Sequence, residues 1–226
     1  PGILQSRQGE PMESKTPLDM AKSFALDGMR HLKSSSYEAA LDAFAASARL
    51  FAEGGDSAGE ACQLMLVADI RCAMNQPDKA LGTYHSILSI LEARGDTAGM
   101  AAVLNNIGLL LARLRRFEEA EAAFSRALRA FEACGKPDRV AEQLGNLGSV
   151  CRDRQEYEAA LDYYRQALQR FEALGCTESV ADQFANLAYI HVMRGDRSAG
   201  LDCFERARTL YEQSGNAARA RGAVRN

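Results

Sequence analysis

The chain of 226 residues has no long apolar run and no excess of positive charge. A helix that crosses a bilayer needs about 20 mainly apolar residues in a row, and no segment provides them. The 27 Lys and Arg residues are balanced by 30 Asp and Glu residues, which gives a net charge of −3. Proteins that bind nucleic acid usually carry a basic patch. The sequence therefore predicts neither membrane insertion nor a nucleic-acid ligand.

Catalytic motifs are missing as well. The chain contains no HExxH, GxSxG, GxxxxGK[ST] or GxGxxG pattern and no EF-hand loop, which mark metal, nucleophile, phosphate, dinucleotide and calcium sites. The three histidines, His31, His85 and His191, form no local pair of metal ligands. The basic cluster at 113–116 closes a predicted helix, where the dipole favours positive charge; binding of phosphate or an acidic peptide is the alternative. We expect a protein that is not an enzyme and needs no cofactor or metal.

The six cysteines form neither a CxxC pair nor an evenly spaced set. Four of them fall within predicted helices, where cysteine serves as a small apolar residue: Cys62, Cys72, Cys151 and Cys203. Cys134 and Cys176 lie in neighbouring predicted loops, so they are the pair whose proximity would indicate a disulfide or a redox site. This usage suits a reducing compartment, and we expect a cytoplasmic protein.

A 40-residue unit recurs along the chain. Residues 101–140 read AAVLNNIGLLLARLRRFEEAEAAFSRALRAFEACGKPDRV, and the same pattern returns after 141 and 181 without insertion or deletion. In the first half of the unit a large residue precedes a small one by four positions, as in Leu104 and Gly108; in the second half Ala120 precedes Phe124. This spacing places an apolar stripe on each of two helices, and small residues facing large ones permit close packing. The period predicts a stacked array of helix pairs.

Turn and capping residues recur at the same interval. Each second helix is followed by a glycine, which can close a helix in the left-handed conformation: Gly55, Gly95, Gly135, Gly175 and Gly215. Asp56 and Asp96 come directly afterwards and are predicted to cap the next helix. Within the repeats, Ser36 and Asp196 are predicted N-caps of second helices.

The triplet Asn106-Ile107-Gly108 returns as Asn146-Leu147-Gly148 and as residues 186–188, where Ala188 replaces the glycine. In the second helix of the repeat, Phe117 follows the first triplet and Tyr157 follows the second. This pattern resembles the tetratricopeptide repeat, in the extended form of G-protein-signalling modulators, kinesin light chains and bacterial peptide-responsive regulators. The resemblance covers roughly residues 18–216. It implies an all-α, right-handed superhelical solenoid of helix-turn-helix repeats. The chain departs from the family in having no tryptophan, and Asp27 stands in an apolar column, so we interpret repeat one as a modified end cap.

The repeat frame gives a domain division. Residues 1–16 are interpreted as a flexible N-terminal lead, and residues 17–216 as five tandem repeats at about 17–60, 61–100, 101–140, 141–180 and 181–216. Residues 217–226 begin a further helix. We interpret it either as a short cap or as the start of a sixth repeat in a chain cut from a longer protein, and favour the second.

The family's geometry implies that the first helices line a concave groove. The residues predicted to contact a bound peptide there are Met65, Leu66, Asp69, Asn105, Asn106, Leu109, Arg113, Asn146, Ser149, Arg152, Asn186 and Tyr189. The first two repeats, which also carry Leu26 and Met29, are apolar there, and the last three are more polar. The family's carboxylate clamp is absent, since its positions hold Ala25, Cys62 and Ala102.

The recurring Asn106, Asn146 and Asn186 have two explanations. A primary amide can donate and accept hydrogen bonds with the backbone of an extended peptide, as this column does in the family, or it can bond the adjacent helix and fix the stacking. We expect a scaffold or adaptor that binds an extended or amphipathic peptide segment of a partner protein. The alternatives are a peptide-responsive sensor module of a larger signalling protein and a homo-oligomeric scaffold assembled through its terminal repeats.

Overall fold

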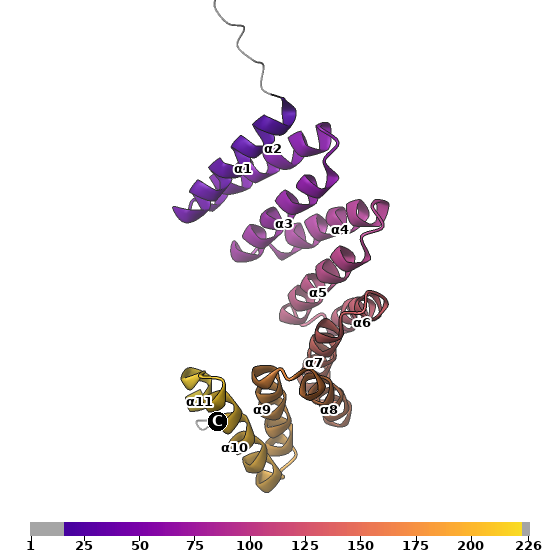
Figure 1. Ribbon diagram of the computed structural model, residues 1–226, viewed down its shortest axis with the longest axis vertical. Helices are drawn as coiled ribbons and strands as arrows, with labels where there is room; N and C mark the ends of the chain where they lie inside the picture. Colours follow the sequence, from indigo (N-terminus) through magenta and orange to yellow (C-terminus); the bar gives the residue numbers. More distant parts are fainter. Residues whose placement is uncertain (1–15, 223–226) are drawn as a thin grey trace, which may run out of the picture. The chain divides into compact units, whose positions relative to one another are not determined.

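The computed structural model describes residues 16–222, and all regular structure in this range is α-helical (Figure 1). The helices, in chain order, are α1 (Pro17–Lys33), α2 (Tyr37–Glu53), α3 (Ser57–Ala73), α4 (Pro77–Ala93), α5 (Thr97–Arg113), α6 (Phe117–Ala133), α7 (Pro137–Asp153), α8 (Tyr157–Leu174), α9 (Thr177–Met193), α10 (Arg197–Gln213) and α11 (Ala217–Gly222). None of the helices in this range combines the length and apolarity needed to cross a bilayer.

Helices adjacent in the chain pack together as sequential pairs. The most extensive contacts join α1 to α2, α5 to α6, α7 to α8 and α9 to α10, the two helices of a repeat in each case. Contacts between repeats join α2 to α3, α6 to α7 and α8 to α9, and α5 also touches α7. The predicted all-α solenoid of helix pairs is therefore confirmed.

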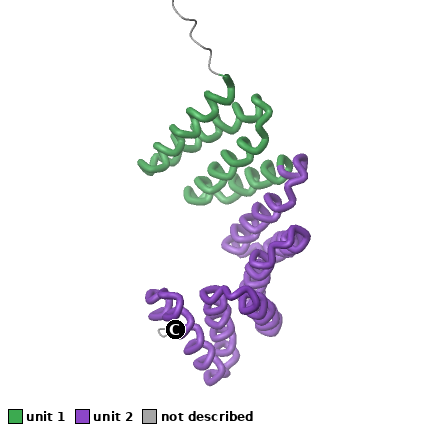
Figure 2. Tube along the Cα trace, in the orientation of Figure 1, with its two compact units in different colours: residues 1–90 green, residues 91–226 purple. Residues whose placement is uncertain are grey.

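The chain divides into two compact units, unit 1 (Pro1–Ile90) and unit 2 (Leu91–Asn226), coloured separately in Figure 2. Unit 1 contains α1, α2, α3 and most of α4, and unit 2 contains α5 to α11. Helices α3, α5, α7 and α9 begin four residues before the repeat frame used above, at Ser57, Thr97, Pro137 and Thr177. The frame was set on Ala61 and its equivalents, which are buried one turn inside each helix.

The predicted aspartate caps are present. Asp56 Oδ1 accepts a hydrogen bond from the Gly59 amide at 2.9 Å, and Asp96 and Asp196 cap α5 and α10 in the same way. The prediction for Ser36 is wrong. Ser36 precedes α2 but makes no capping bond, because its hydroxyl instead pairs with the Ser34 hydroxyl at 3.2 Å.

The turns use the left-handed conformation throughout. Every glycine predicted to end a second helix has a positive φ, between 62° and 78°. The turns inside the repeats do the same, but four of the five place a residue other than glycine there: Ser35, Asn75, Arg115 and Gln155, with φ between 56° and 64°. Side chains with a Cβ are mildly strained in this region, so these turns cost some stability.

Glycines and aromatic rings meet in the core as the column pattern predicted. Phe124, which is 1% exposed, lies against Gly108, and Phe44 and Tyr164 lie against Gly28 and Gly148 in the same way. The packing predicted for the large residues of the first helices does not hold at Phe24. This side chain is 41% exposed, since no helix within the described residues precedes α1 to cover it.

The cysteines are all free thiols, and Cys151 is buried in a core cluster with Leu161 and Ile190. Cys62 corrects the prediction that helical cysteines are fillers, since it is exposed on α3.

Candidate functional site

The predicted peptide-binding residues lie on the first helices of both units. In unit 2 they follow one side of α5, α7 and α9, here called the amide face: Asn105, Asn106, Leu109 and Arg113 on α5, Asn146, Ser149 and Arg152 on α7, and Asn186 and Tyr189 on α9. Met65, Leu66 and Asp69 lie on α3 of unit 1. Each unit is described by itself.

A pocket of about 430 Å³ opens on the amide face between α7 and α9. Three predicted residues line it, namely Asn146, Ser149 and Asn186. Gly145, Asp182 and Gln183 are also among the residues that line it. The structure thus brings predicted residues of two successive repeats together around one cavity.

Hydrogen bonds between side-chain amides join α5 to α7. Asn105 Oδ1 accepts from Gln143 Nε2 and from Asn146 Nδ2, each at 3.0 Å. Asn105 Nδ2 donates in turn to Asn106 Oδ1 at 3.4 Å. The amide of Asn146 therefore bonds a neighbouring helix, which is the stacking role that the sequence left open for this column.

The equivalent junction between α7 and α9 lacks this network. Gly145 stands 40 residues after Asn105, while Gln183 and Asn186 match Gln143 and Asn146. Gln183 is only 6% exposed, and neither its amide nor that of Asn186 has a hydrogen-bond partner within residues 16–222.

Sequence reasoning missed Gln143 and Gln183. Both are buried, as is Gln63, and all three follow the buried alanine of the repeat by two positions. Their recurrence at multiples of 40 residues was a signal that could have found them. The recurrence of glutamine points to a site only where the side chain is buried, because a buried polar group needs hydrogen-bond partners that an exposed one finds in water.

The remaining unit 2 residues form a second contact group on the amide face. The Arg152 guanidinium lies over the Tyr189 ring, 5.8 Å from its centre, and its Nε donates to Asp153 Oδ1 at 2.8 Å. The Ser149 hydroxyl hydrogen-bonds to the Gly145 carbonyl and to the Tyr164 hydroxyl. Tyr189 is 46% exposed and so offers an aromatic surface beside the pocket.

In unit 1 the exposed apolar surface belongs mainly to α1. Leu26 is 61% exposed and Met29 is also exposed, whereas Met65 and Leu66 are half-buried and Leu66 packs against the core. Asp69 accepts a hydrogen bond from the Tyr84 hydroxyl at 3.4 Å. Burial raises the pKa of Asp69, and the Tyr84 hydroxyl opposes that shift in part.

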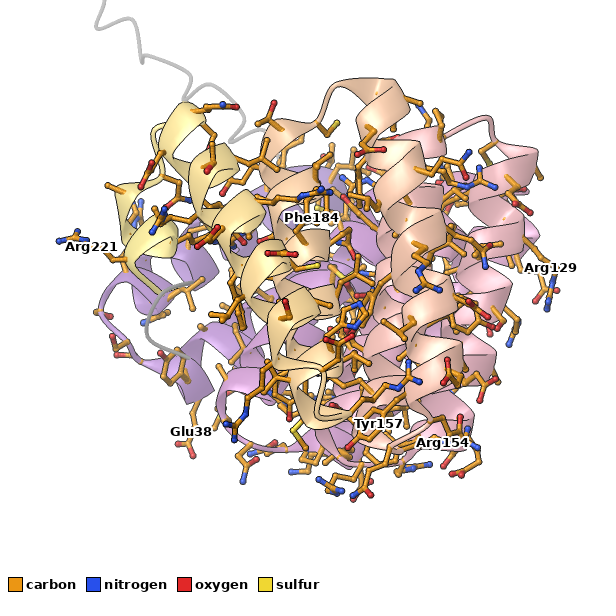
Figure 3. The ribbon with its side chains drawn as sticks, turned by 90° about the horizontal axis from the view of Figure 1, so that it is seen from below. Glu38, Arg129, Arg154, Tyr157, Phe184 and Arg221 are labelled. Atoms are coloured by element: carbon orange, nitrogen blue, oxygen red, sulfur yellow. The ribbon has the colours of Figure 1, made fainter. Side chains whose placement is uncertain are left out.

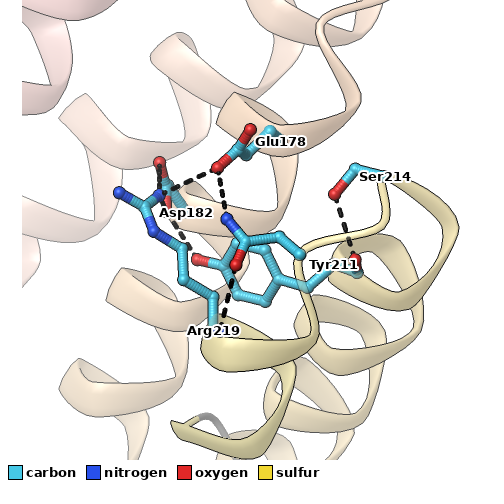
Figure 4. Close-up of polar contacts among 6 residues, drawn as sticks. Glu178, Asp182, Tyr211, Ser214 and Arg219 are labelled. Carbon is cyan, nitrogen blue, oxygen red and sulfur yellow. Dashed lines mark hydrogen bonds and ion pairs between the residues drawn. The ribbon is translucent and has the colours of Figure 1, made fainter.

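Ion pairs satisfy the carboxylates around the pocket. Arg219 of α11 donates to both oxygens of Asp182, at 2.6 and 2.8 Å, and the Tyr211 hydroxyl donates to the same carboxylate (Figure 4). Glu142, at the other side, accepts from Arg139 Nη1 at 2.8 Å. Because each carboxylate is paired with an arginine, the rim carries little uncompensated charge.

Another polar cluster in the described residues is a network of ion pairs around Arg154. Arg154, labelled beside Tyr157 in Figure 3, pairs with Glu121 and Glu156 at 2.7 Å each. No group of three or more His, Cys, Asp or Glu side chains in the described range is placed to hold a metal ion. The pocket on the amide face is taken as the candidate site, because three of the predicted residues line it.

Comparison with known proteins agrees with the repeat pattern. Residues 99–173, which span most of α5 to α8, match the tetratricopeptide repeat family. Comparison with curated protein sequences finds no match.

Solved structures show the fold over nearly all of the chain. Aspartyl phosphate phosphatase F from Bacillus subtilis matches with a TM-score of 0.79 at 18% identity, over 89% of this chain and 53% of that one. The tetratricopeptide-like repeats of a putative kinesin light chain from Podosopora anserina match with a TM-score of 0.70 at 12% identity, over 90% and 99%. A Rap protein complexed with competence and sporulation factor matches with a TM-score of 0.66 at 17% identity, over 88% and 56%. The chain thus has a tetratricopeptide-like fold and spans about half the length of the phosphatase and Rap proteins.

Proposed function

We propose that this chain is a non-catalytic interaction module that binds a peptide segment of a partner protein on the amide face. Tetratricopeptide repeats are generally protein-binding modules, and the fold is typically non-catalytic. The observation that carries the proposal is the pocket between α7 and α9, where the unpaired amide of Asn186 lies at a position predicted to contact peptide. A cytoplasmic location stays a prediction from the cysteine usage.

The chemistry of the face suits an extended segment. An extended backbone presents N–H and C=O groups along both edges, and a primary amide such as that of Asn186 satisfies one of each. Tyr189 and Leu109, both exposed, provide apolar contact area on either side of α7. Arg152, held by Asp153 and by the Tyr189 ring, adds a positioned cation. The face therefore combines hydrogen bonding with apolar contact.

A sensor module of a larger protein is the second candidate. The Rap protein in the comparison is complexed with competence and sporulation factor, and its fold is matched here over about half its length. In that case peptide binding would occur on the same face but would control an attached segment. Self-association through terminal repeats is the remaining alternative, and light scattering at increasing protein concentration would detect it.

The test is a pull-down with matched baits. The face variant carries Asn186→Ala and Tyr189→Ala, and the control carries Gln166→Ala and Arg170→Ala on exposed positions of α8. Asn146 is left intact, because its replacement would break the bond to Asn105. Circular dichroism melting establishes that both variants fold. A partner retained by wild type and control but lost from the face variant supports the proposal. Retention by the face variant with loss from the control moves the site to the second helices.

A further inference from the structure

Two equivalent junctions of unit 2 differ in one hydrogen-bond acceptor. Between α5 and α7, Asn105 Oδ1 lies 3.0 Å from both Gln143 Nε2 and Asn146 Nδ2 and satisfies both donors. Between α7 and α9 the donors remain, as Gln183 and Asn186, but Gly145 replaces the acceptor. Within the described residues no other group takes its place.

The missing side chain leaves accessible space rather than a collapsed contact. Gly145, Gln183 and Asn186 all line the pocket of about 430 Å³. A Cβ placed on Gly145 would lie 3.4 Å from Gln183 Oε1 and 3.5 Å from Gln183 Nε2, which is ordinary contact distance. The amide end of Gln183 therefore borders the space that an asparagine at 145 would occupy. This part of the pocket, bounded by Gly145, Gln183 and Asn186, is called the amide slot.

A buried amide without partners is costly, and most such groups in folded proteins are satisfied by protein, water or a ligand. Gln183 is more than nine-tenths buried, and its Oε1 is buried without a partner, as are Gln63 Oε1 and Gln143 Oε1. The two junctions differ in the donor Nε2, which is paired with Asn105 at Gln143 and has no partner within residues 16–222 at Gln183. A water molecule can satisfy one or two of the groups in the slot. A planar group with both an acceptor and a donor satisfies more of them, because it can pair with the two edges of the Gln183 amide at once.

We propose that the amide slot binds the primary amide of an asparagine or glutamine side chain in the bound peptide. The ligand carbonyl oxygen takes the place that Asn105 Oδ1 has at the other junction and accepts from Gln183 Nε2 and Asn186 Nδ2. The ligand NH₂ group donates to Gln183 Oε1. This assignment rests on the proposed function, and it adds the side-chain class that the face selects.

Charge at the rim favours this neutral ligand over charged ones. Arg219 and Arg139 are already bound to Asp182 and Glu142, so neither is free to pair with a carboxylate ligand, and a carboxylate has no hydrogen to donate to the unpaired Gln183 Oε1. A lysine or arginine side chain would have to compete with Arg219 and Arg139, which already occupy those carboxylates. A primary amide needs neither carboxylate and satisfies the Gln183 amide directly.

The test uses acetamide as the primary-amide probe and acetate as the charged control. Both are titrated into ¹⁵N-labelled protein, and the side-chain NH₂ signals of glutamine and asparagine are followed by NMR. Acetamide should shift the signals of Gln183 and Asn186 and leave those of Gln143, which does not line the pocket, in place. Acetate should bind roughly tenfold more weakly or not at all.

Three variants make the test specific. Gly145→Asn supplies the acceptor in cis, as Asn105 does, and should weaken acetamide binding roughly tenfold or more. Gly145→Ala, which adds only the Cβ, should bind acetamide about as wild type does. Asn105→Gly should create a second slot, so that acetamide then shifts the signals of Gln143 as well. Circular dichroism confirms the fold of each variant.

The opposite results overturn the proposal. Unshifted Gln183 and Asn186 signals in wild type, equal shifts with acetate, or undiminished binding in Gly145→Asn would each show that the slot does not recognise primary amides. If the pull-down still depends on Asn186 and Tyr189, the face binds its partner without this specificity and only the slot is refuted. If the pull-down fails but acetamide behaves as expected, the slot stands and the proposed partner class is refuted.

Discussion

Adding one methyl group at Gly108 tests how tightly the two helices of a repeat are packed. A Cβ at Gly108 would lie 2.6, 2.7 and 2.8 Å from three atoms of the Phe124 ring, where carbon atoms normally approach to about 3.5–4.0 Å. The ring is buried, so it must move by about 1 Å, and overpacking of this kind costs about 1–3 kcal/mol. Alanine in a helix interior recovers about 1 kcal/mol relative to glycine. Gly108→Ala should therefore lower the free energy of unfolding by about 0–2 kcal/mol.

The matched control is Gly145→Ala, on the first helix of the next repeat in the same unit. Its Cβ would meet its nearest atom at 3.4 Å, so only the gain in helix propensity applies, and stability should rise by about 1 kcal/mol. The two variants should thus differ by about 1–3 kcal/mol.

Urea unfolding followed by circular dichroism measures both variants against wild type. Gly108→Ala combined with Phe124→Leu should recover part of the loss, because the smaller side chain leaves room for the methyl group. If Gly108→Ala raises the midpoint as much as Gly145→Ala does, the close packing inferred for this column is refuted.

Three further perturbations follow from particular residues. Burial raises the pKa of Asp69, so the folded state favours the protonated carboxyl. The protonated carboxyl therefore contributes to the stability of the fold at pH values below the usual pKa of 3.8, and this stability is lost as the pH rises through the raised pKa. Asp69→Asn should therefore raise the melting temperature at pH 7, and a difference that persists unchanged at pH 3 would contradict this reasoning. Gln155→Gly should raise the free energy of unfolding by about 0.5–1 kcal/mol, since Gln155 has φ +64°, and an unchanged urea midpoint would argue against strain in that turn. Exposed Cys62 should react with iodoacetamide in the folded protein, whereas Cys151, whose pKa burial raises to about 11, should react only after unfolding, as mass spectrometry of labelled peptides would show.

The helices and their ends could be predicted because they depend on nearby residues. The Asp56, Asp96 and Asp196 caps each bond an amide three residues ahead, and the glycine that ends each second helix needs only its own backbone freedom. The predicted Ser36 cap was wrong for an equally local reason, since the Ser36 hydroxyl bonds the Ser34 hydroxyl instead. The predictions that Phe24 and Cys62 are packed in the core were wrong because the exposure of a side chain depends on which helix covers it. The repeat pattern treats every position in a column alike.

The candidate site was also predicted in part from the sequence. Equivalent repeat columns placed Asn146, Ser149 and Asn186 on one face, and the structure brings these three to one pocket. The sequence alone could not separate Asn146 from Asn186, since both have the same place in their repeats.

Tertiary structure separates them through contacts between residues 38 and 41 positions apart. Asn105 accepts from the amide NH₂ groups of Gln143 and Asn146, while Gly145 leaves those of Gln183 and Asn186 unpaired beside the pocket. Local sequence thus determined where the helices and the amides lie. Packing between repeats decided which amides bond a neighbouring helix and which remain available to a ligand, because a hydrogen bond requires both partners within about 3 Å.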